Sequence, residues 1–352
     1  METSMKAAFL SALRQIEIGD APEPQLTGPR DVLLRVDAVG VCGSDVHYYR
    51  TGRIGAAVVK FPFVLGHEFA GTIEKTGAEV RGLRPGQRVA IDPLVACGHC
   101  DQCRAGRPNT CRNQRFTGNP GELSGALAEF VVLPEECCHP IPESLTADQA
   151  AMIEPLSIGV HAQRLAQMET GSTIAILGSG PIGLCVMLAS RAAADCTVYM
   201  TDLIEERLAM AAQLGARWTG NPRRTDVVKA ICDVEPAGVD FVFECAGEQE
   251  TLDQAVELLK PGGTLVMVGI PEFDEVNFSA HTLRRKELTI RNVRRQNHCM
   301  APAIELVSSG RINIDPLMTH NFPLGETAAA FDLVSGYHDG VIKAIIHVAG
   351  ND

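Results

Sequence analysis

The segment from Ser172 to Ser190, STIAILGSGPIGLCVMLAS, constrains the fold more than any other part of this chain. It carries no charge over about the length that spans a bilayer. Its centre, however, is the run GSGPIG at positions 178–183, which no continuous helix would tolerate. We therefore predict a buried strand over 173–177, a tight glycine turn and a helix over 181–194, rather than a membrane span.

The glycines of this turn match the fingerprint of a dinucleotide-binding site. Gly178 makes the turn, Gly180 admits a pyrophosphate, and Gly183 lets the helix and strand pack closely. Pro181 and Ile182 open the helix, whose N-terminal amides and dipole suit a phosphate. A strand, a glycine turn and a helix in this order predict a nucleotide cofactor.

Asp202 ends the next predicted strand, about twenty residues after the glycines. A carboxylate there binds two ribose hydroxyls and repels a 2′-phosphate, which favours NAD over NADP. Two observations leave the role of Asp202 and the choice of coenzyme open. Asp also suits a helix cap, and the nearby Arg207 could either serve a phosphate or stack on adenine.

Strands and helices alternate through the middle of the chain. We predict strands over 197–201, 239–244 and 264–268 and helices over 205–214 and 251–259, with Pro261-Gly262-Gly263 ending the second helix. Alternation of this kind indicates an α/β fold with a doubly wound parallel sheet, a Rossmann domain.

A chain of 352 residues normally forms two domains. Short β-prone runs at 32–36, 71–74 and 87–91, separated by turn signals, predict a small barrel-like β domain at the N-terminal side. A helix over 301–308 and a strand over 341–348 return to it. We predict this first domain over 1–157 and 293–352, and the Rossmann domain over 158–292.

The net charge and the placement of the cysteines indicate which partners and which cellular compartment to expect. The net charge of −12 makes nucleic acid an unsuitable partner. The twelve cysteines are not spaced as in a secreted disulfide framework, which indicates reduced thiols. The start, METSMKAAFL, has no apolar run of signal-peptide length. We expect a cytoplasmic protein.

Four of the cysteines form a compact group, C-x2-C-x2-C-x7-C, at Cys97, Cys100, Cys103 and Cys111. Four thiolates on so short a loop can surround one tetrahedral ion and leave no open position, so the spacing predicts a structural zinc site. Disulfides are disfavoured by the reduced compartment. An iron–sulfur cluster uses similar ligands, and the spacing alone leaves it open.

The candidate catalytic residues lie upstream of this group. Cys42 and His67-Glu68 combine a thiol, an imidazole and a carboxylate, and Glu154 adds a second carboxylate. Each alone could be an ordinary buried residue. Together they make a mixed sulfur, nitrogen and oxygen set suited to a zinc ion with one open position.

Five stretches of sequence, in order, resemble the zinc-containing medium-chain dehydrogenases: VGVCGSDVHYYRTGRIG, FPFVLGHEFAGTIEKTG, the four-cysteine loop, IEPLSIGVHA and ILGSGPIG. Within that family the chain is most similar to sorbitol dehydrogenase and related polyol dehydrogenases. The similarity continues through RRKELTI and PLMTHNFPLGETAAAF. It implies a GroES-like catalytic domain, a Rossmann domain and a homotetramer.

The resemblance also implies roles for single residues. Cys42, His67 and Glu68 would bind the catalytic zinc, and Glu154 would hold the zinc-bound water or bind the metal itself. Asp45 would orient His67, and Ser44 and His47 match the proton-relay positions. Substrate positions are Tyr48, Glu154 and Arg295, which can supply a donor, an acceptor and a charged donor. The cofactor positions are Gly178, Gly180, Pro181, Ile182, Gly183, Asp202, Arg207, Val268, Gly269, Val293 and Arg295.

One position departs from the family pattern. Sorbitol dehydrogenases usually carry an aromatic residue after the arginine that Arg295 matches, and this chain has Gln296. The departure bears on which polyol is used, because the residue would border the substrate. The departure leaves the predicted zinc ligands unchanged.

The implied activity is oxidation of a secondary hydroxyl of a polyol to a ketose. Two zinc ions per chain and NAD would serve it, and the proton would leave through Ser44 and His47. The sequence leaves two different functions open. One is a zinc dehydrogenase of threonine, butanediol, an inositol or a sugar phosphate, and the second is a non-catalytic structural protein or zinc or redox sensor.

Overall fold

The computed structural model of the chain describes residues 3–348 and contains two compact units. The first comprises Met1–Glu154 with Val307–Asp352, and the second comprises Pro155–Leu306. Each unit has its own buried core, which agrees with the expectation of two domains. The domain boundaries that we predicted, near 157 and 293, stay a prediction. In the structure, the segment 293–306 belongs to the second unit.

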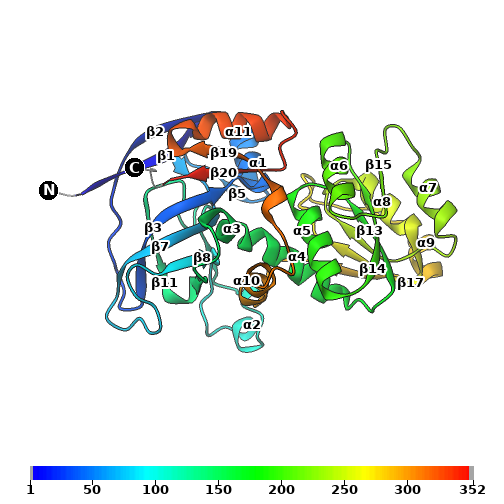
Figure 1. Ribbon diagram of the computed structural model, residues 1–352, viewed down its shortest axis with the longest axis horizontal. Helices are drawn as coiled ribbons and strands as arrows, with labels where there is room; N and C mark the ends of the chain where they lie inside the picture. Colours follow the sequence, from blue (N-terminus) through cyan, green and yellow to red (C-terminus); the bar gives the residue numbers. More distant parts are fainter. Residues whose placement is uncertain (1–2, 349–352) are drawn as a thin grey trace. The chain divides into compact units, whose positions relative to one another are not determined.

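The first unit is rich in short strands (Figure 1). Its strands are β1 (Ser4–Ala12), β2 (Gln15–Pro22), β3 (Asp31–Gly40), β4 (Arg53–Ile54), β5 (Ala57–Val58), β6 (Phe63–Val64), β7 (Glu68–Thr76), β8 (Arg88–Ile91), β9 (Leu94–Val95), β10 (Arg115–Phe116), β11 (Phe130–Pro134), β12 (Cys138–Pro140), β19 (Met318–Pro323) and β20 (Lys343–His347). Its helices are α1 (Gly43–Thr51), α2 (Asp101–Arg104), α3 (Ala147–Ala151) and α11 (Thr327–Gly336).

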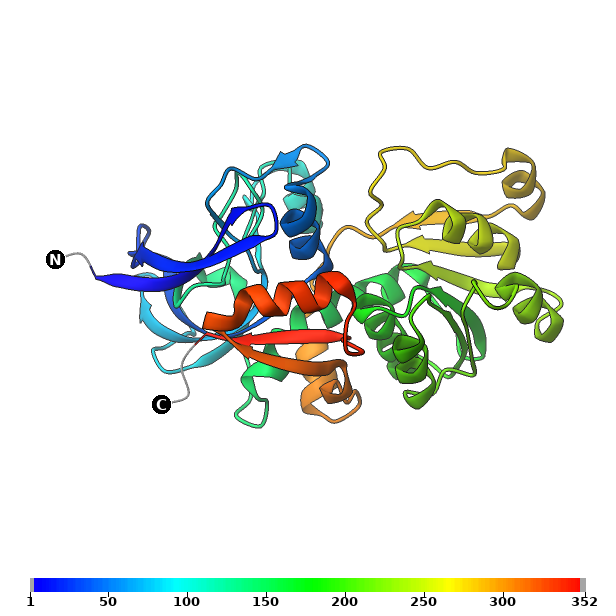
Figure 2. The same ribbon diagram turned by 90° about the horizontal axis from the view of Figure 1, so that it is seen from above.

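Strand β3 lies inside the largest sheet of this unit and pairs with three other strands. It pairs antiparallel with β7, β11 and β20, within a sheet of order β12-β8-β7-β3-β20-β19. The C-terminal strand β20 thus lies beside a strand from the first forty residues, and α11 lies along it (Figure 2). Leu34, Phe69 and Ile346 are fully buried in the core between these elements. Each such side chain contributes about 1.5–3 kcal/mol of hydrophobic stabilisation.

The second unit alternates strands and helices. Its strands are β13 (Ser172–Leu177), β14 (Cys196–Thr201), β15 (Trp218–Gly220), β16 (Val239–Glu244), β17 (Leu259–Met267) and β18 (Thr289–Asn292). Its helices are α4 (Ile153–Ala166), α5 (Pro181–Ala193), α6 (Glu205–Gln213), α7 (Val227–Val234), α8 (Gln249–Leu258), α9 (Ala280–Lys286) and α10 (Met300–Ser308).

These six strands form one parallel sheet of order β15-β14-β13-β16-β17-β18. This is the order of a Rossmann fold, in which ligands bind where the order reverses, here between β13 and β16. Figure 1 shows α5 and α6 on one side of the sheet and α7, α8 and α9 on the other. Because both faces are covered, Ile174, Ile176 and Val242 are fully buried, as the apolar run predicted. The predicted α/β doubly wound fold is confirmed.

The glycine pair after Pro261 does not act as we predicted. Helix α8 ends at Leu258, and Pro261-Gly262-Gly263 lies inside β17 rather than closing the helix. The pairing of β17 with β16 shifts register between Val239 and Phe241, and Gly262 has a φ of 78°. The extra residues of β17 between Leu259 and Thr264 therefore form a bulge. Glycine suits this place because it adopts a positive φ without strain.

Within residues 3–348, no helix is long and apolar enough to cross a membrane.

Candidate active site

Strand pairing brings a cysteine, a histidine and a glutamate together in the first unit. Gly40, at the end of β3, pairs with Glu68, at the start of β7. Because the strands are antiparallel, the residues just after β3 and just before β7 meet at the same end of the sheet. One ligand atom each of Cys42, His67 and Glu68 lies within 4.8 Å of the others. The structure thus assembles three of the four side chains that we predicted for the catalytic metal.

His67 is held from two sides. Its Nδ1 lies 3.3 Å from Asp45 Oδ1, and Asp45 is only 1% exposed. The ring of Phe116 packs against it with a centroid distance of 5.4 Å. Burial opposes a charged imidazole, but Asp45 and Cys42 outweigh it and raise the pKa of His67 well above its ordinary value. The anionic surroundings therefore favour a positive charge at this place.

Glu154 is not a member of this group of close ligand atoms. It lies in the first turn of α4 and is 6% exposed. Burial, opposed by His67 and reinforced by Glu68, raises its pKa to about 8. Of the two glutamates, the group of close ligand atoms found among the described residues contains Glu68 and not Glu154.

Lys343 is the functional-site neighbour that sequence reasoning missed. Its Nζ lies 2.5 Å from Glu68 Oε2 and donates to the carbonyl of Val41 at 3.0 Å. The contact arises because β20 pairs with β3, with Ile345 opposite Gly40. The one available signal was a lone lysine in the apolar run VIKAIIHV, since a charge in a buried strand needs a partner.

Helix α1 carries the predicted proton-relay and substrate residues. Cys42 is its N-cap, and Ser44 Oγ donates to Cys42 Sγ at 3.3 Å. Tyr48 is one helical turn after Ser44 and therefore lies on the same face. Its hydroxyl donates to Asn119 Oδ1 at 2.8 Å. His47 is partly exposed, as an exit to solvent requires.

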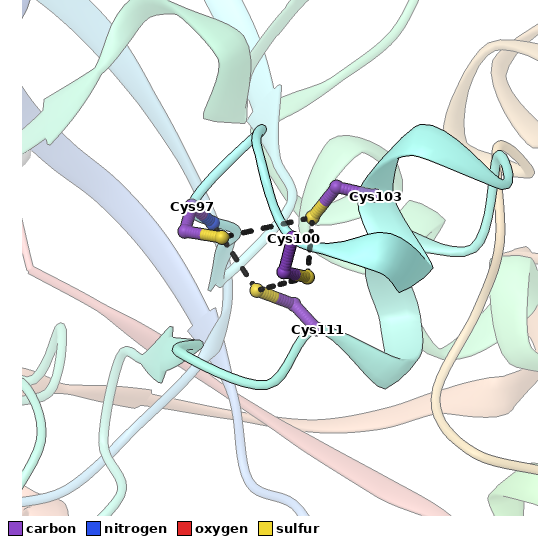
Figure 3. Close-up of side chains that lie close together, drawn as sticks. All are labelled: Cys97, Cys100, Cys103 and Cys111. Carbon is purple, nitrogen blue, oxygen red and sulfur yellow. Dashed lines mark hydrogen bonds between the residues drawn. The ribbon is translucent and has the colours of Figure 1, made fainter.

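The four clustered cysteines form the second group of potential metal ligands (Figure 3). Their sulfurs point toward one another, with separations of 3.5 Å (Cys100 to Cys103), 3.9 Å (Cys100 to Cys111) and 4.0 Å (Cys97 to Cys103). A tetrahedral ion with Zn–S bonds of about 2.3 Å places its sulfurs about 3.8 Å apart. Sulfurs at these distances are not joined in disulfides. The loop therefore fits one tetrahedral metal ion.

Backbone N–H groups donate to sulfur atoms of this loop. The amides of Cys97 and Asn113 donate to Cys111 Sγ at 3.3 and 3.4 Å. The backbone N–H of Arg112 lowers the pKa of Cys100 to about 6. Because a metal binds the thiolate, these donors prepare the loop for an ion.

The glycine turn of the second unit has the shape that a pyrophosphate site needs. Gly178 has a φ of 102°, and a Cβ on Gly183 would lie on the carbonyl oxygen of Gly178, closer than any real contact. Only glycine fits either position. Gly180 is the N-cap of α5, Pro181 follows, and the amides of the first turn, including that of Ile182, are at the helix N-terminus. These residues fit a dinucleotide.

The carboxylate of Asp202 ties the glycine turn to the end of β14. It accepts hydrogen bonds from the amides of Ser179 at 2.7 Å and Ile204 at 2.9 Å. Arg207 lies beside it, 3.9 Å from Asp202 Oδ2, and its guanidinium would contact a Cβ on Gly180 at 3.4 Å. Asp202 thus binds one amide in the glycine turn and one just before α6, and Arg207 lies beside the glycine turn.

The remaining predicted cofactor residues lie after β17 and β18. The amides of Val268 and Gly269 both donate to the carbonyl of Glu244, at the end of β16, and the amide of Val293 donates to Met267. Arg295 has a φ of 55°. Such a left-handed residue other than glycine is strained by about 1–3 kcal/mol and is often found at functional sites.

Gln296 has a structural partner that explains its departure from the family pattern. It is 6% exposed, and its Oε1 accepts a hydrogen bond from the amide of Cys299 at 2.7 Å, just before α10. An aromatic ring at this position could not accept that bond.

Comparisons with known proteins identify the family to which a chain with this geometry belongs. The "Alcohol dehydrogenase GroES-like domain" model matches residues 28–143, and the "Zinc-binding dehydrogenase" model matches residues 181–309. A sorbitol dehydrogenase of Bacillus subtilis is 36% identical over 345 residues, 98% of this chain and 97% of that protein. The chain belongs to the zinc-containing medium-chain dehydrogenases. Both the resemblance and the GroES-like first domain that we predicted are confirmed.

Two further proteins are similar to this dehydrogenase over most of its length. An L-idonate 5-dehydrogenase of Vitis vinifera is 38% identical over 325 residues, 91% of this chain and 88% of that one. A solved structure from Sinorhizobium meliloti 1021, described as a zinc-binding dehydrogenase bound to NADP, has a TM-score of 0.90 and 34% identity. It covers 99% of this chain and 100% of its own.

Proposed function

We propose that this dehydrogenase oxidises a secondary hydroxyl of an open-chain polyol to a ketose, with NAD as the hydride acceptor. The observation that carries the proposal is the group of Cys42, His67 and Glu68 in a chain similar over nearly its whole length to a sorbitol dehydrogenase. Three mixed ligands leave an open position for a substrate oxygen. When bound, zinc would lower the pKa of the alcohol and NAD would accept the hydride.

The residues of the first unit supply binding and proton transfer. Cys42, His67 and Glu68 hold the metal, and Asp45 keeps the His67 ring oriented through its Nδ1. Glu154, outside the ligand group, holds the oxygen at the open position. Ser44, which is hydrogen-bonded to Cys42, accepts the hydroxyl proton and releases its own proton in the direction of His47, which passes it to solvent.

Substrate recognition and coenzyme binding share Arg295 and otherwise use different residues. Tyr48, Glu154 and Arg295 bind the hydroxyls that flank the reacting carbon. A site that hydrogen-bonds several hydroxyls discriminates strongly against alcohols that lack them, because its polar groups are then left unpaired. In the second unit, the carboxylate of Asp202 binds the adenosine ribose of NAD. The four-cysteine loop holds the structural zinc ion. We further propose a cytoplasmic homotetramer.

The alternative is a zinc dehydrogenase of another secondary alcohol, such as threonine, butanediol, an inositol or a sugar phosphate. Initial rates of NADH formation with the zinc-loaded protein distinguish a polyol dehydrogenase from a dehydrogenase of another secondary alcohol. We expect sorbitol or xylitol to exceed 2-propanol and threonine in kcat/KM by about a hundredfold or more. If a monoalcohol or threonine exceeded every polyol, the zinc dehydrogenase assignment would stand and the polyol would not.

A further inference from the structure

The segment between β18 and α10 contains two residues in an unfavourable backbone conformation. Arg295 has a φ of 55° and His298 has a φ of 52°, and neither is a glycine. Residues with a side chain rarely adopt a positive φ, so contacts with the surrounding structure must hold this segment. At its first end, the amide of Val293 donates to the carbonyl of Met267, which joins the segment to β17.

Gln296 holds the second end of the segment from within. Its side chain is buried, and its Oε1 accepts a hydrogen bond from the amide of Cys299 at 2.7 Å. Cys299 is itself fully buried and begins α10, because its carbonyl accepts from the amide of Ala303. An N–H at the start of a helix has no partner inside the helix. Gln296 therefore supplies the acceptor that this buried amide requires.

Arg164 holds the same end from outside. It lies in the last turn of α4, and its guanidinium donates to the carbonyl of His298 and to Cys299 Sγ, both at 3.3 Å. The thiol of Cys299 donates in turn to the carbonyl of Asn297 at 3.2 Å. Burial outweighs Arg164 and raises the pKa of this thiol, which therefore keeps its hydrogen. One guanidinium thus binds a left-handed residue and the start of the next helix.

These contacts bear on Arg295 because its side chain leaves the segment that they hold. If Arg295 relaxed from a φ of 55° to the right-handed region, φ would change by about 100° or more, and the Cα–Cβ bond would point elsewhere. Its side chain is the one that we propose as a ligand of both the coenzyme and the substrate. A side chain that is already oriented loses less entropy when its ligand binds.

We propose that Gln296 and Arg164 are positioning residues, which hold Arg295 in the conformation that binds the coenzyme. They act through the backbone of residues 296–299 rather than by contact with a ligand. From the sequence we expected Gln296 to border the substrate. In the structure, the departure from the family pattern replaces an aromatic ring by an acceptor for the backbone. The inference rests on the proposed role of Arg295.

The test measures the dissociation constant of NADH by fluorescence titration of the zinc-loaded protein. Gln296→Leu removes the acceptor at similar volume and changes no charge. Arg164→Met removes the donor at an exposed position, where the fold tolerates the change. We expect each substitution to raise the dissociation constant about tenfold, because one hydrogen bond from a charged group to the coenzyme is misaligned.

The controls match each substitution. Arg164→Lys keeps the charge and a donor, and it should recover most of the affinity for NADH. Arg217→Met and Gln213→Leu make the corresponding changes at exposed positions of the second unit and should leave the dissociation constant unchanged. Melting temperatures measured in parallel show whether each variant is folded.

A double-mutant cycle separates positioning from general support of the fold. In Arg295→Met the positioned side chain is absent, so Gln296→Leu should cause no further loss of NADH affinity in that background. If Arg295→Met weakens binding, this inference alone is overturned by losses that add in full, or by an unchanged dissociation constant in both folded single variants. An unchanged constant in Arg295→Met would overturn the proposed role of Arg295 and this inference with it.

Discussion

The ammonium group of Lys343 lies 2.5 Å from the carboxylate of Glu68, and each side chain is 1% exposed. The pair joins β20, near the C-terminus, to the start of β7, next to His67. A carboxylate buried this deeply is stable in its charged form only with such a partner. The candidate metal site therefore depends on a residue from the opposite end of the chain.

Removing the charge of Lys343 should destabilise the first unit. In Lys343→Met with no zinc at the Cys42 site, Glu68 stays buried without a cationic partner, and we expect the free energy of unfolding to fall by about 3–5 kcal/mol. The matched control is Lys229→Met, which breaks the exposed pair with Asp233 and should change stability by less than about 1 kcal/mol. Denaturant unfolding measures both. Equal effects of the two substitutions would refute the role of Lys343.

The protein should bind two zinc ions per chain with different strengths. Mild chelation should remove the ion at Cys42 and abolish activity first, because that site is open and the four-cysteine site is closed. Cys103→Ser should lose one zinc and unfold more easily, whereas Cys232→Ser should keep both. Elemental analysis with a parallel melting curve measures this. A fully active protein with fewer than two zinc ions per chain would contradict it.

Asp202 should set the coenzyme preference. Asp202→Asn keeps an acceptor for one of the two backbone amides and removes the charge that repels a 2′-phosphate, so the NADP/NAD ratio of kcat/KM should rise about tenfold or more. Asp195→Asn, an exposed aspartate in the same unit, should leave the ratio unchanged. Initial rates with each coenzyme decide the matter. A wild type that already prefers NADP would refute this role of Asp202.

His161 should make the second unit sensitive to acid. Burial, reinforced by Arg164, lowers its pKa from 6.5 to about 4. As the pH falls below 6.5, the unfolded chain takes up a proton at this histidine more readily than the folded protein does. The folded protein therefore has its full stability above pH 6.5 and loses part of it as the pH falls toward 4. The loss amounts to about 2 kcal/mol, because the site is not fully shielded from water.

His161→Gln cannot gain a proton, so its stability should fall less over the same pH range. His281→Gln, at an exposed position, should behave like the wild type. Urea unfolding at a series of pH values measures the difference. Parallel curves for His161→Gln and the wild type would exclude the buried histidine as the source.

The local patterns of the sequence predicted the local structure well. The apolar run, glycine turn and helix became β13 and α5 within about one residue, because burial and backbone geometry are set by neighbours in the chain. The failure at Pro261-Gly262-Gly263 has a physical cause. A helix stop and a bulge in a strand call for the same residues, and only pairing with β16 makes the segment part of β17.

Spacing along the chain determined the four-cysteine loop, the glycine fingerprint and the cysteine, histidine and glutamate set, because each function needs particular residue types at short separations. Tertiary structure decided which groups surround them. It placed Lys343 on Glu68 across 275 positions and Asn119 on Tyr48 across 71 positions, and it gave Gln296 the amide of Cys299 to bind. The register of β3 with β7 and β20 brings residues from both ends of the chain to one end of a sheet. Such contacts leave no periodic trace in the sequence, since they depend on which strands become neighbours and not on which residues precede one another.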